Sequence, residues 1–382
     1  MGRKNSFIIW TMTAACVFGA CGRSDGDGMV DIGKEEQMEA ADLTEQTAQH
    51  VTIDYNIESY ESIQKFGHDL LMQSIQDQNP VLSPVSAYLA LSMAGCGADG
   101  ATREEFYNVL GKDMMTLSDD MMNTLPAEGD LLKLVIADSV WIDDRFIVDD
   151  TWIGTVGSLM DAEIYQEKLS TEETMKKINH WIDDRTSGLI DQMLEQPLNE
   201  AVRLALINTV YFKGKWEIPF DANDTRREEF YLNGDRDTAV QVDMMNLYLT
   251  DLDYVANDFA EGIVLPYRKN DDGKGSEDLA FVALKPTENG DVREVYRELT
   301  REVMDDILVN KKTETVNLKL PKFELTFDKV LNDSLSDMGL TECFDMEKAN
   351  FDQMGKTLDG DNLFIGLVRQ KAKIIVDEEG TE

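Results

Sequence analysis

Cysteine, histidine, proline and positive charge are all scarce in this chain of 382 residues. Four cysteines are too few for a fold held by disulfides, and eight prolines with 26 glycines exclude a collagen-like or low-complexity chain. Lys and Arg number 36 against 74 Asp and Glu, which gives a formal net charge of −38. A surface this negative repels a polyanion, which argues against nucleic-acid binding. Hydrophobic residues make up 42% of the chain, enough for a large globular core.

The first 20 residues have the pattern of a removable targeting segment. Arg3 and Lys4 precede an apolar run over 7–18, which is too short to span a bilayer as a stable helix. Gly-Ala-Cys then ends at Cys21, an order that resembles a bacterial lipoprotein signal and predicts a lipid on Cys21 after cleavage. The alternative is plain secretory cleavage without the lipid. Either way we expect an extracellular protein, anchored by its lipid to the bacterial cell surface or otherwise secreted.

Residues 21–50 are polar, acidic and almost free of aromatic side chains. Such a segment has too little apolar surface to fold on its own, so we interpret it as a flexible tether. The apolar periodicity begins after it and continues to the last residue. The sequence therefore predicts one folded domain over 51–382.

The fold class predicted for this domain is α+β, with helices around large mixed β-sheets. Helical spacing of apolar residues and long β-branched runs alternate along it, and no repeat is found. The runs over 131–142 and 201–212 are typical of strands buried on both faces. The predicted helices cover 57–76, 83–93 and 171–189, and the remaining predicted strands cover 279–284, 315–327 and 363–376.

Motifs for catalysis are weak. Ser62-Ile-Gln-Lys65 matches the Ser-x-x-Lys pattern of penicillin-binding proteins and β-lactamases, but the Lys-Thr-Gly that should follow is missing. Neither Gly-x-Ser-x-Gly nor His-Glu-x-x-His occurs. Cys96 and Cys343 lack a Cys-x-x-Cys spacing, and we interpret them as buried free thiols. We therefore expect a protein that is not an enzyme and that needs neither a cofactor nor a metal.

Several segments resemble the serpin family, in the order in which the family has them. They are NPVLSPVSAYLALSM (79–93), LINTVYFKGKW (206–216), VLPY (264–267), LPKF (320–323), Phe344 with ANF (349–351) and Met354, and IVDEEGTE (375–382). The resemblance runs from about residue 57 to the last residue. It implies a serpin-like fold with a five-stranded central sheet that is able to accept an inserted strand.

The resemblance also implies a mechanism and a partner. A serpin is a suicide inhibitor: a protease cuts an exposed loop, the loop inserts into the central sheet, and the protease stays trapped as its acyl-enzyme. The partner would be a serine or cysteine protease, met by a monomeric inhibitor. The segment that opens such a loop is the hinge, and the matching residues are Glu378, Glu379, Gly380, Thr381 and Glu382.

Two further sites follow from the resemblance. The shutter, where the sheet parts, matches Ser83, Ser86 and Asn208, with Gln370 at a position where the family usually has His. Gln does not titrate near neutrality, so a shutter gated by pH is in doubt, and a buried polar network that only satisfies itself is the alternative. The breach, where the loop first enters, matches Trp216 over a Lys322–Glu378 pair. The alternative is a core Trp beside an ordinary ion pair.

The expected function is an exported serine protease inhibitor that uses the suicide-substrate mechanism. The first alternative is a non-inhibitory serpin-fold surface protein used for binding, or an inactive truncated serpin. The second is an enzyme that uses Ser62 and Lys65. The small-residue run, bait residue and closing strands that a serpin has after its hinge do not follow Glu382. We therefore interpret the sequence as a fragment of a longer serpin.

Overall fold

The structure is a computed structural model that describes residues 14–20, 61–75, 80–231, 239–270, 279–287 and 292–382. The predicted tether and Cys21 lie outside these residues. The helices are α1 (Glu61–Ser74), α2 (Pro84–Cys96), α3 (Gly100–Leu110), α4 (Met114–Thr124), α5 (Asp150–Leu159), α6 (Glu172–Arg185), α7 (Val292–Glu298), α8 (Arg301–Val309) and α9 (Asn332–Asp337). The strands are β1 (Ala14–Ala20), β2 (Leu132–Asp143), β3 (Phe146–Val148), β4 (Glu163–Glu167), β5 (Val202–Lys215), β6 (Arg226–Tyr231), β7 (Ala239–Ala256), β8 (Ala260–Pro266), β9 (Ala280–Pro286), β10 (Lys312–Pro321), β11 (Phe323–Val330), β12 (Gly355–Thr357), β13 (Leu363–Val376) and β14 (Gly380–Thr381).

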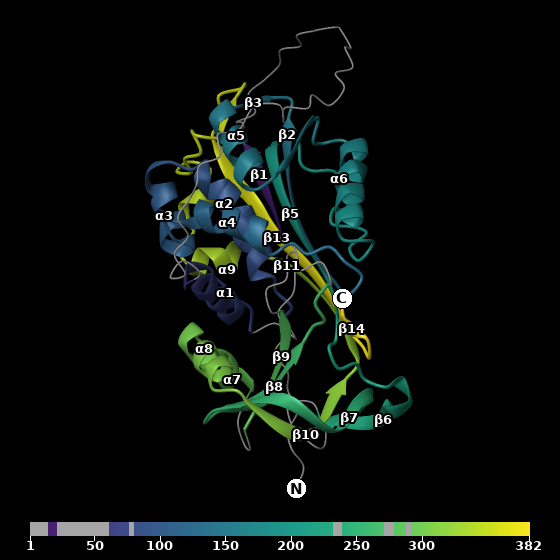
Figure 1. The fold of residues 1–382 in the computed structure, drawn as a ribbon. Helices are drawn as coiled ribbons and strands as arrows, with labels where there is room; N and C mark the ends of the chain where they lie inside the picture. Colours follow the sequence, from purple (N-terminus) through teal and green to yellow (C-terminus); the bar gives the residue numbers. More distant parts are fainter. Residues whose placement is uncertain (1–13, 21–60, 76–79, 232–238, 271–278, 288–291) are drawn as a thin grey trace.

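A sheet of seven strands runs along the middle of the molecule (Figure 1). Five of its strands are β11, β13, β5, β2 and β4, and the other two, β1 and β14, both lie between β13 and β5. Because β1 and β14 are antiparallel to both neighbours, β13 and β5 run parallel to each other. The predicted class of helices around mixed sheets is confirmed. We call the space between β13 and β5 the slot.

The central sheet separates two layers of helices (Figure 1). The largest core lies between one face of the sheet and α1 to α5, and a second core lies between the other face and α6. In β5, Leu204 and Leu206 belong to the first core, and Ala205 and Ile207 belong to the second. This strand is therefore buried on both faces, as its apolar run predicted.

The N-terminus of the helix α2 contacts both walls of the slot. Ser83 caps it by accepting a hydrogen bond from the backbone N–H of Ser86 at 3.2 Å, and Pro84 occupies the first turn, where a missing N–H costs little. All its residues from Pro84 to Gly95 except Val85 are buried. The helix predicted over 83–93 is confirmed, and it places its N-terminus against both walls of the slot.

The prediction of a single strand over 315–327 is wrong, because the structure has two strands there. β10 pairs with β7 in a second sheet, whereas β11 pairs with β13 at the edge of the central sheet. Pro321 ends β10, where it has no N–H to donate, and Lys322 forms the crossing between the sheets with its N–H on the carbonyl of Asp243 at 2.8 Å. A continuous run of alternating residues carries no sign that its two halves belong to different sheets.

The N-terminal strand β1 belongs to the segment that the sequence predicts to be a targeting signal. In the structure Ala14 lies opposite both Asn208 of β5 and Gln370 of β13, and the strand continues to Ala20 opposite Leu363. A segment in this position gains backbone hydrogen bonds from both neighbours, as in other cases of strand addition. Removal of the segment by a signal peptidase stays a prediction.

The second sheet has the order β10, β7, β8 and β9, with β6 on β7. It lies at the lower end of the view in Figure 1, where α7 and α8 cover it. The strand predicted over 279–284 corresponds to β9. Within the described ranges no helix is long and apolar enough to cross a membrane.

Candidate functional site

The slot holds a chain segment at each end. At one end β14 follows β13 through a tight turn, and Glu382 exchanges two backbone hydrogen bonds with Ile375, at 2.6 and 2.9 Å. At the other end β1 begins opposite Gln370. Residues 371–374 of β13 lie between the two segments. The slot therefore accepts strands whose direction is opposite to that of both walls.

Gly380 is the residue at which the hinge enters the sheet. It pairs with Lys215 of β5, and a Cβ placed on it would lie 1.9 Å from the carbonyl oxygen of Gly214. The obstacle is backbone on a strand that is itself held on both sides, so it cannot move away. Only glycine allows the hinge to approach β5 this closely.

The next residues of the hinge are held by side chains of the sheet. Thr381 is 4% exposed, and Tyr267 donates its hydroxyl to Thr381 Oγ1 at 2.8 Å. Glu382 accepts hydrogen bonds from Tyr211, at 2.5 Å, and from Lys213, at 2.9 Å. Burial tends to raise the pKa of Glu382, but these two donors outweigh it and hold the pKa below its ordinary value. The hinge residues after the turn are thus already part of the sheet.

The predicted breach residues meet where the hinge turns. Lys322 Nζ lies 2.7 Å from Glu378 Oε2, and Thr225 donates to the other carboxylate oxygen at 2.8 Å. The hydrogen bond to Glu378 raises the pKa of Lys322. Burial opposes ionisation of Glu378, but its donors, chiefly Lys322, lower its pKa overall. The carboxylate is therefore held in its charged form.

Trp216 is 1% exposed and contacts the chain on either side of Glu378. Its indole N–H donates to the carbonyl of Asp377 and its backbone N–H donates to the carbonyl of Glu379, both at 2.9 Å. Its ring stacks on Tyr267 with centroids 5.0 Å apart. Trp216 therefore fixes the turn of the hinge, and release of the hinge has to break both hydrogen bonds.

The predicted shutter residues form two buried links from α2 to the walls of the slot. Gln370 of β13 donates Nε2 to the carbonyl of Ser83 at 2.9 Å and accepts the N–H of Ser83 at 3.2 Å. Ser86 donates its hydroxyl to Asn208 Oδ1 of β5 at 2.5 Å. Ser83 and Ser86 are joined through the cap of α2. One helix end therefore bridges both walls while Ala14 of β1 lies between Asn208 and Gln370. Further separation of the walls has to strain one of the two links.

Asp138 of β2 belongs to this network, and sequence reasoning missed it. Asn208 donates Nδ2 to Asp138 Oδ1 at 3.0 Å, and the two residues lie directly opposite each other in the sheet. The carboxyl is 1% exposed. A signal was present, because an acidic residue interrupts the apolar run over 132–142, but its partner is 70 residues away along the chain.

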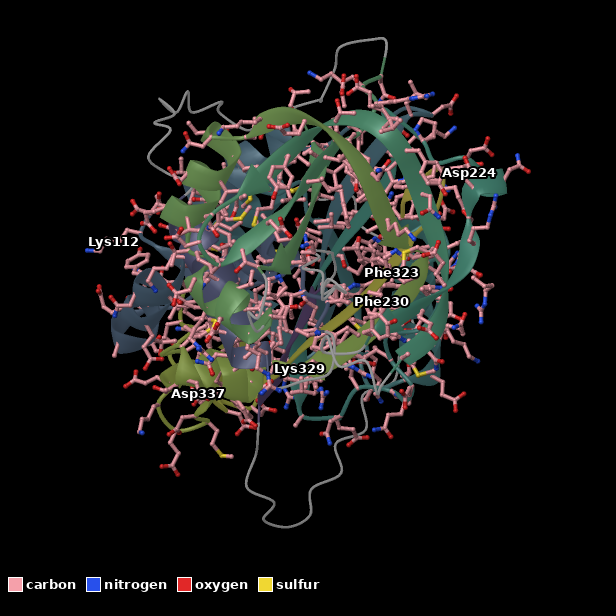
Figure 2. The ribbon with its side chains drawn as sticks, turned by 90° about the horizontal axis from the view of Figure 1, so that it is seen from below. Lys112, Asp224, Phe230, Phe323, Lys329 and Asp337 are labelled. Carbon is pink, nitrogen blue, oxygen red and sulfur yellow. The ribbon has the colours of Figure 1, made fainter. Side chains whose placement is uncertain are left out.

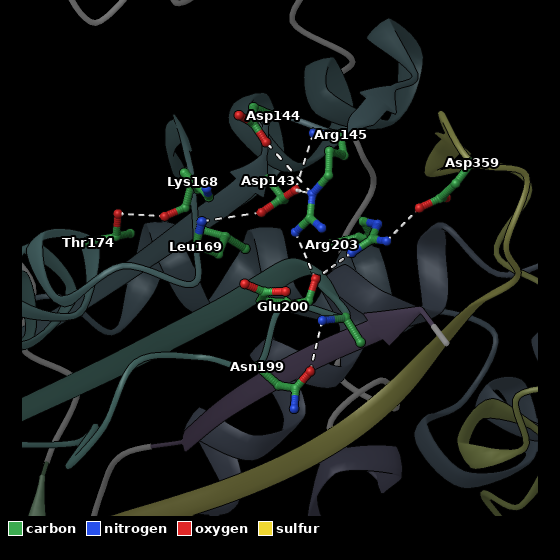
Figure 3. A network of polar contacts seen from close by, with 11 residues as sticks. Asp143, Asp144, Arg145, Lys168, Leu169, Thr174, Asn199, Glu200, Arg203 and Asp359 are labelled. Atoms are coloured by element: carbon green, nitrogen blue, oxygen red, sulfur yellow. Dashed lines mark hydrogen bonds and ion pairs between the residues drawn. The ribbon is translucent and has the colours of Figure 1, made fainter. Parts of the chain in front are cut away.

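A charged network closes the slot at the end opposite the hinge (Figure 3). Arg203 of β5 is 4% exposed and pairs with Asp359, in the loop before β13, at 2.6 Å. Arg203 and Arg145 both donate to the carbonyl of Glu200, at 2.8 and 2.7 Å, and Arg145 also binds Asp143 at 2.6 Å. The Asp359 side chain is 41% exposed, so the ion pair is only partly buried. It ties the wall β5 to the loop before β13 at the end of the slot where β1 lies between the two walls.

The alternative catalytic pair is not assembled. Ser62 Oγ lies 3.4 Å from Asp113, whereas Lys65 is exposed and binds Asp69 at 2.6 Å, one turn further along α1. Burial raises the pKa of the Cys96 thiol to about 12, so it is not a nucleophile at neutral pH. Across the described segments no group of three or more His, Cys, Asp and Glu is placed to hold a metal ion.

The surface around the site is charged. From below, Lys112, Asp224 and Asp337 lie at the periphery of the molecule (Figure 2). Lys213, Lys322 and Arg203, which lie along the slot, each pair with a carboxylate. The excess of acidic residues therefore gives the molecule a negative field at long range.

Comparison with known proteins identifies what this arrangement is similar to. Residues 61–382 match the family described as Serpin (serine protease inhibitor). Iripin-1 of Ixodes ricinus is 30% identical over 83% of this chain and 81% of its own, and intracellular coagulation inhibitor 1 of Tachypleus tridentatus is 31% identical over 83% and 76%. The crystal structure of the thermophilic serpin tengpin in the latent state is 31% identical, with a TM-score of 0.77 over 87% of this chain and 88% of that one.

Proposed function

Because this chain belongs to the serpin family, we propose that it inhibits a serine or cysteine protease by loop cleavage, strand insertion and trapping of the acyl-enzyme. Members of the family are generally protease inhibitors without enzymatic activity of their own, and this chain is not an enzyme. The fold with its helices around mixed sheets is that of the family.

The observation that carries the proposal is the position of the hinge inside the central sheet. Thr381 pairs with both walls of the slot and Gly380 pairs with β5, and both residues are as small as this position requires. A bulky or charged residue at either position would keep the hinge out of the sheet. The part of the slot between β14 and β1, opposite residues 371–374 of β13, lies directly ahead of Glu382.

The trap needs a sheet that parts at one place and holds at another. The links of Gln370 and Asn208 to the N-terminus of α2 supply a point that opens by exchanging hydrogen bonds. The Lys322–Glu378 pair and Trp216 hold the turn of the hinge at the end of the slot where β14 enters. Complete insertion makes many backbone hydrogen bonds at once, so the inserted state is more stable than the uncleaved one.

The test is covalent trapping of a protease. Protein expressed from the complete gene is mixed with trypsin-, chymotrypsin- and papain-type proteases and separated in SDS. We expect an SDS-resistant complex with at least one of them. The matched control is Thr381→Arg, which leaves the cleavage site intact but blocks insertion, so this variant is expected to be cleaved without forming a complex. Cleavage of the wild-type protein without a complex would identify a non-inhibitory surface protein.

We also propose that the inhibitor is exported and anchored through Cys21, with the acidic tether between the lipid and the domain. This rests on the sequence pattern around Cys21 alone. Mass spectrometry of protein isolated from membranes tests it, with Cys21→Ala as the control. An N-terminus at Cys21 with a diacylglycerol mass is expected, and an unmodified Cys21 would reduce the proposal to secretion.

A further inference from the structure

Asp138 is a buried carboxyl for which the proposed mechanism has no role. Its Oδ1 accepts the hydrogen bond from Asn208, whereas Oδ2 is buried without a hydrogen-bond partner among the described residues. A neutral carboxylic acid tolerates this environment, but an ionised carboxylate needs more donors than one amide. The two protonation states of Asp138 therefore differ greatly in how well they fit this buried network.

Asp138 is connected to the shutter by hydrogen bonds. The links run from Asp138 through Asn208 to Ser86, over distances of 3.0 and 2.5 Å. Asn208 lies in β5, the wall of the slot, and directly faces the position that Ala14 of β1 occupies. A change in the charge of Asp138 therefore reaches this wall through a single hydrogen bond.

The groups around Asp138 leave its charge unbalanced. From β5 it faces the amide of Asn208, and from α2 the hydroxyl of Ser86 completes the network, both uncharged. Asp161, in the turn after α5, contributes a like charge, and Glu163 of β4 is occupied by Arg185. Burial raises the pKa of Asp138 to about 7, the hydrogen bond from Asn208 opposes this shift, and the charge of Asp161 adds to it.

We propose that Asp138 makes the hold of β5 on α2, and with it the mobility of this wall of the slot, depend on pH. The neutral carboxyl keeps Asn208 hydrogen-bonded to Ser86, whereas the ionised carboxylate favours a state in which β5 moves away from α2 and water reaches Asp138. Strand insertion is then slow in mildly acidic conditions and faster above neutrality. The proposal rests on the shutter of the proposed function, and it replaces the titratable group that Gln370 does not supply.

The sign of the effect follows from the two pKa values. In the unfolded chain Asp138 ionises at its ordinary pKa of 3.8, and in the folded chain at about 7. The folded chain thus binds the proton more tightly, and its advantage is lost as the pH rises from the first value to the second. Relative to Asp138→Asn, the unfolding constant of the wild type is expected to rise up to about a thousandfold over this window and to stay constant above it.

The experiment compares wild-type protein, Asp138→Asn and Asp161→Asn across this pH range. Infrared spectra are expected to show a protonated carboxylic acid band that disappears near neutral pH in the wild type and is missing from Asp138→Asn. Asp161 is on the surface, so Asp161→Asn folds normally and is expected to move the midpoint to lower pH by removing a like charge. Hydrogen–deuterium exchange of β5 and β13, corrected for the intrinsic pH dependence, measures the mobility of the two walls.

Two results would overturn the inference. One is a wild-type infrared band and exchange profile identical to those of Asp138→Asn at every pH. The other is an unchanged midpoint in Asp161→Asn together with exchange of β5 that does not follow the band. Neither readout requires a protease, so a failure to trap proteases would refute the proposed function and leave this inference standing.

Discussion

Gly380→Ala tests the hinge most directly, because it adds a single methyl group at the tightest approach in the slot. The new Cβ would lie 1.9 Å from the oxygen and 2.9 Å from the carbon of the Gly214 carbonyl. Van der Waals contact requires about 3.4 Å or more, so β14 has to withdraw from β5 by roughly 1.5 Å. That displacement breaks the backbone pairing of β14 with β5 and strains the bonds of Trp216 and Phe220 to the carbonyls of Glu379 and Glu378.

The size of the effect follows from those bonds. Loss of two or three backbone hydrogen bonds at about 1 kcal/mol each disfavours the inserted hinge by about 2–3 kcal/mol. Such a difference shifts the equilibrium between inserted and released hinge by roughly 30- to 150-fold. The assay is hydrogen–deuterium exchange of peptides that cover 377–382 and 213–217, with urea unfolding as a second readout.

The matched control for Gly380→Ala is Gly154→Ala, which adds the same methyl group to α5 where no atom outside the adjoining turns of that helix lies within 4 Å. This control should keep wild-type exchange at the hinge and gain up to about 1 kcal/mol from helix propensity. The reasoning is refuted if Gly380→Ala protects the hinge peptides as well as the wild type does and unfolds at the same urea concentration.

Three further predictions concern the same end of the slot. Lys322→Glu puts two like charges beside each other and should lower stability by about 1 kcal/mol and speed heat-induced polymerisation, measured by native electrophoresis; a clean monomer with unchanged melting would contradict this. Thr381→Val removes the acceptor of the buried Tyr267 hydroxyl and should cost about 1–3 kcal/mol in urea unfolding, whereas Thr381→Ser, which keeps the acceptor, should cost much less. The lowered pKa of Glu378 means that its contribution to stability is complete above 4.5, its ordinary value, and is lost as the pH falls further; Glu378→Gln should abolish this acid dependence in pH-dependent melting curves.

Parts of this site could be predicted from the sequence because they depend on local order. The apolar pattern predicted β13 over 363–376 to the residue, and the resemblance of the segment after it to a serpin hinge gave the position of the hinge. Asp138 could not be paired with Asn208 in advance, because the partners of a strand in a sheet are set by non-local contacts that leave no trace in spacing. The crossing at Lys322 was missed for the same reason. The close approach of Gly380 to Gly214 is a property of packing between two strands, which composition does not encode.

The tight turn between β13 and β14 has a consequence for how the chain folds. Asp377 accepts the N–H groups of Glu379 and Gly380, so β13 and β14 form a hairpin from neighbouring residues. Hairpins of this kind form in about 1–10 μs, whereas a wall contributed by β5, more than 150 residues earlier, joins on the slower timescale of non-local pairing. During refolding the hinge is therefore in place beside β13 before β5 arrives. This order of contact formation favours a hinge inside the sheet. A nascent chain that keeps its loop outside the sheet therefore has to overcome the early pairing of β14 with β13.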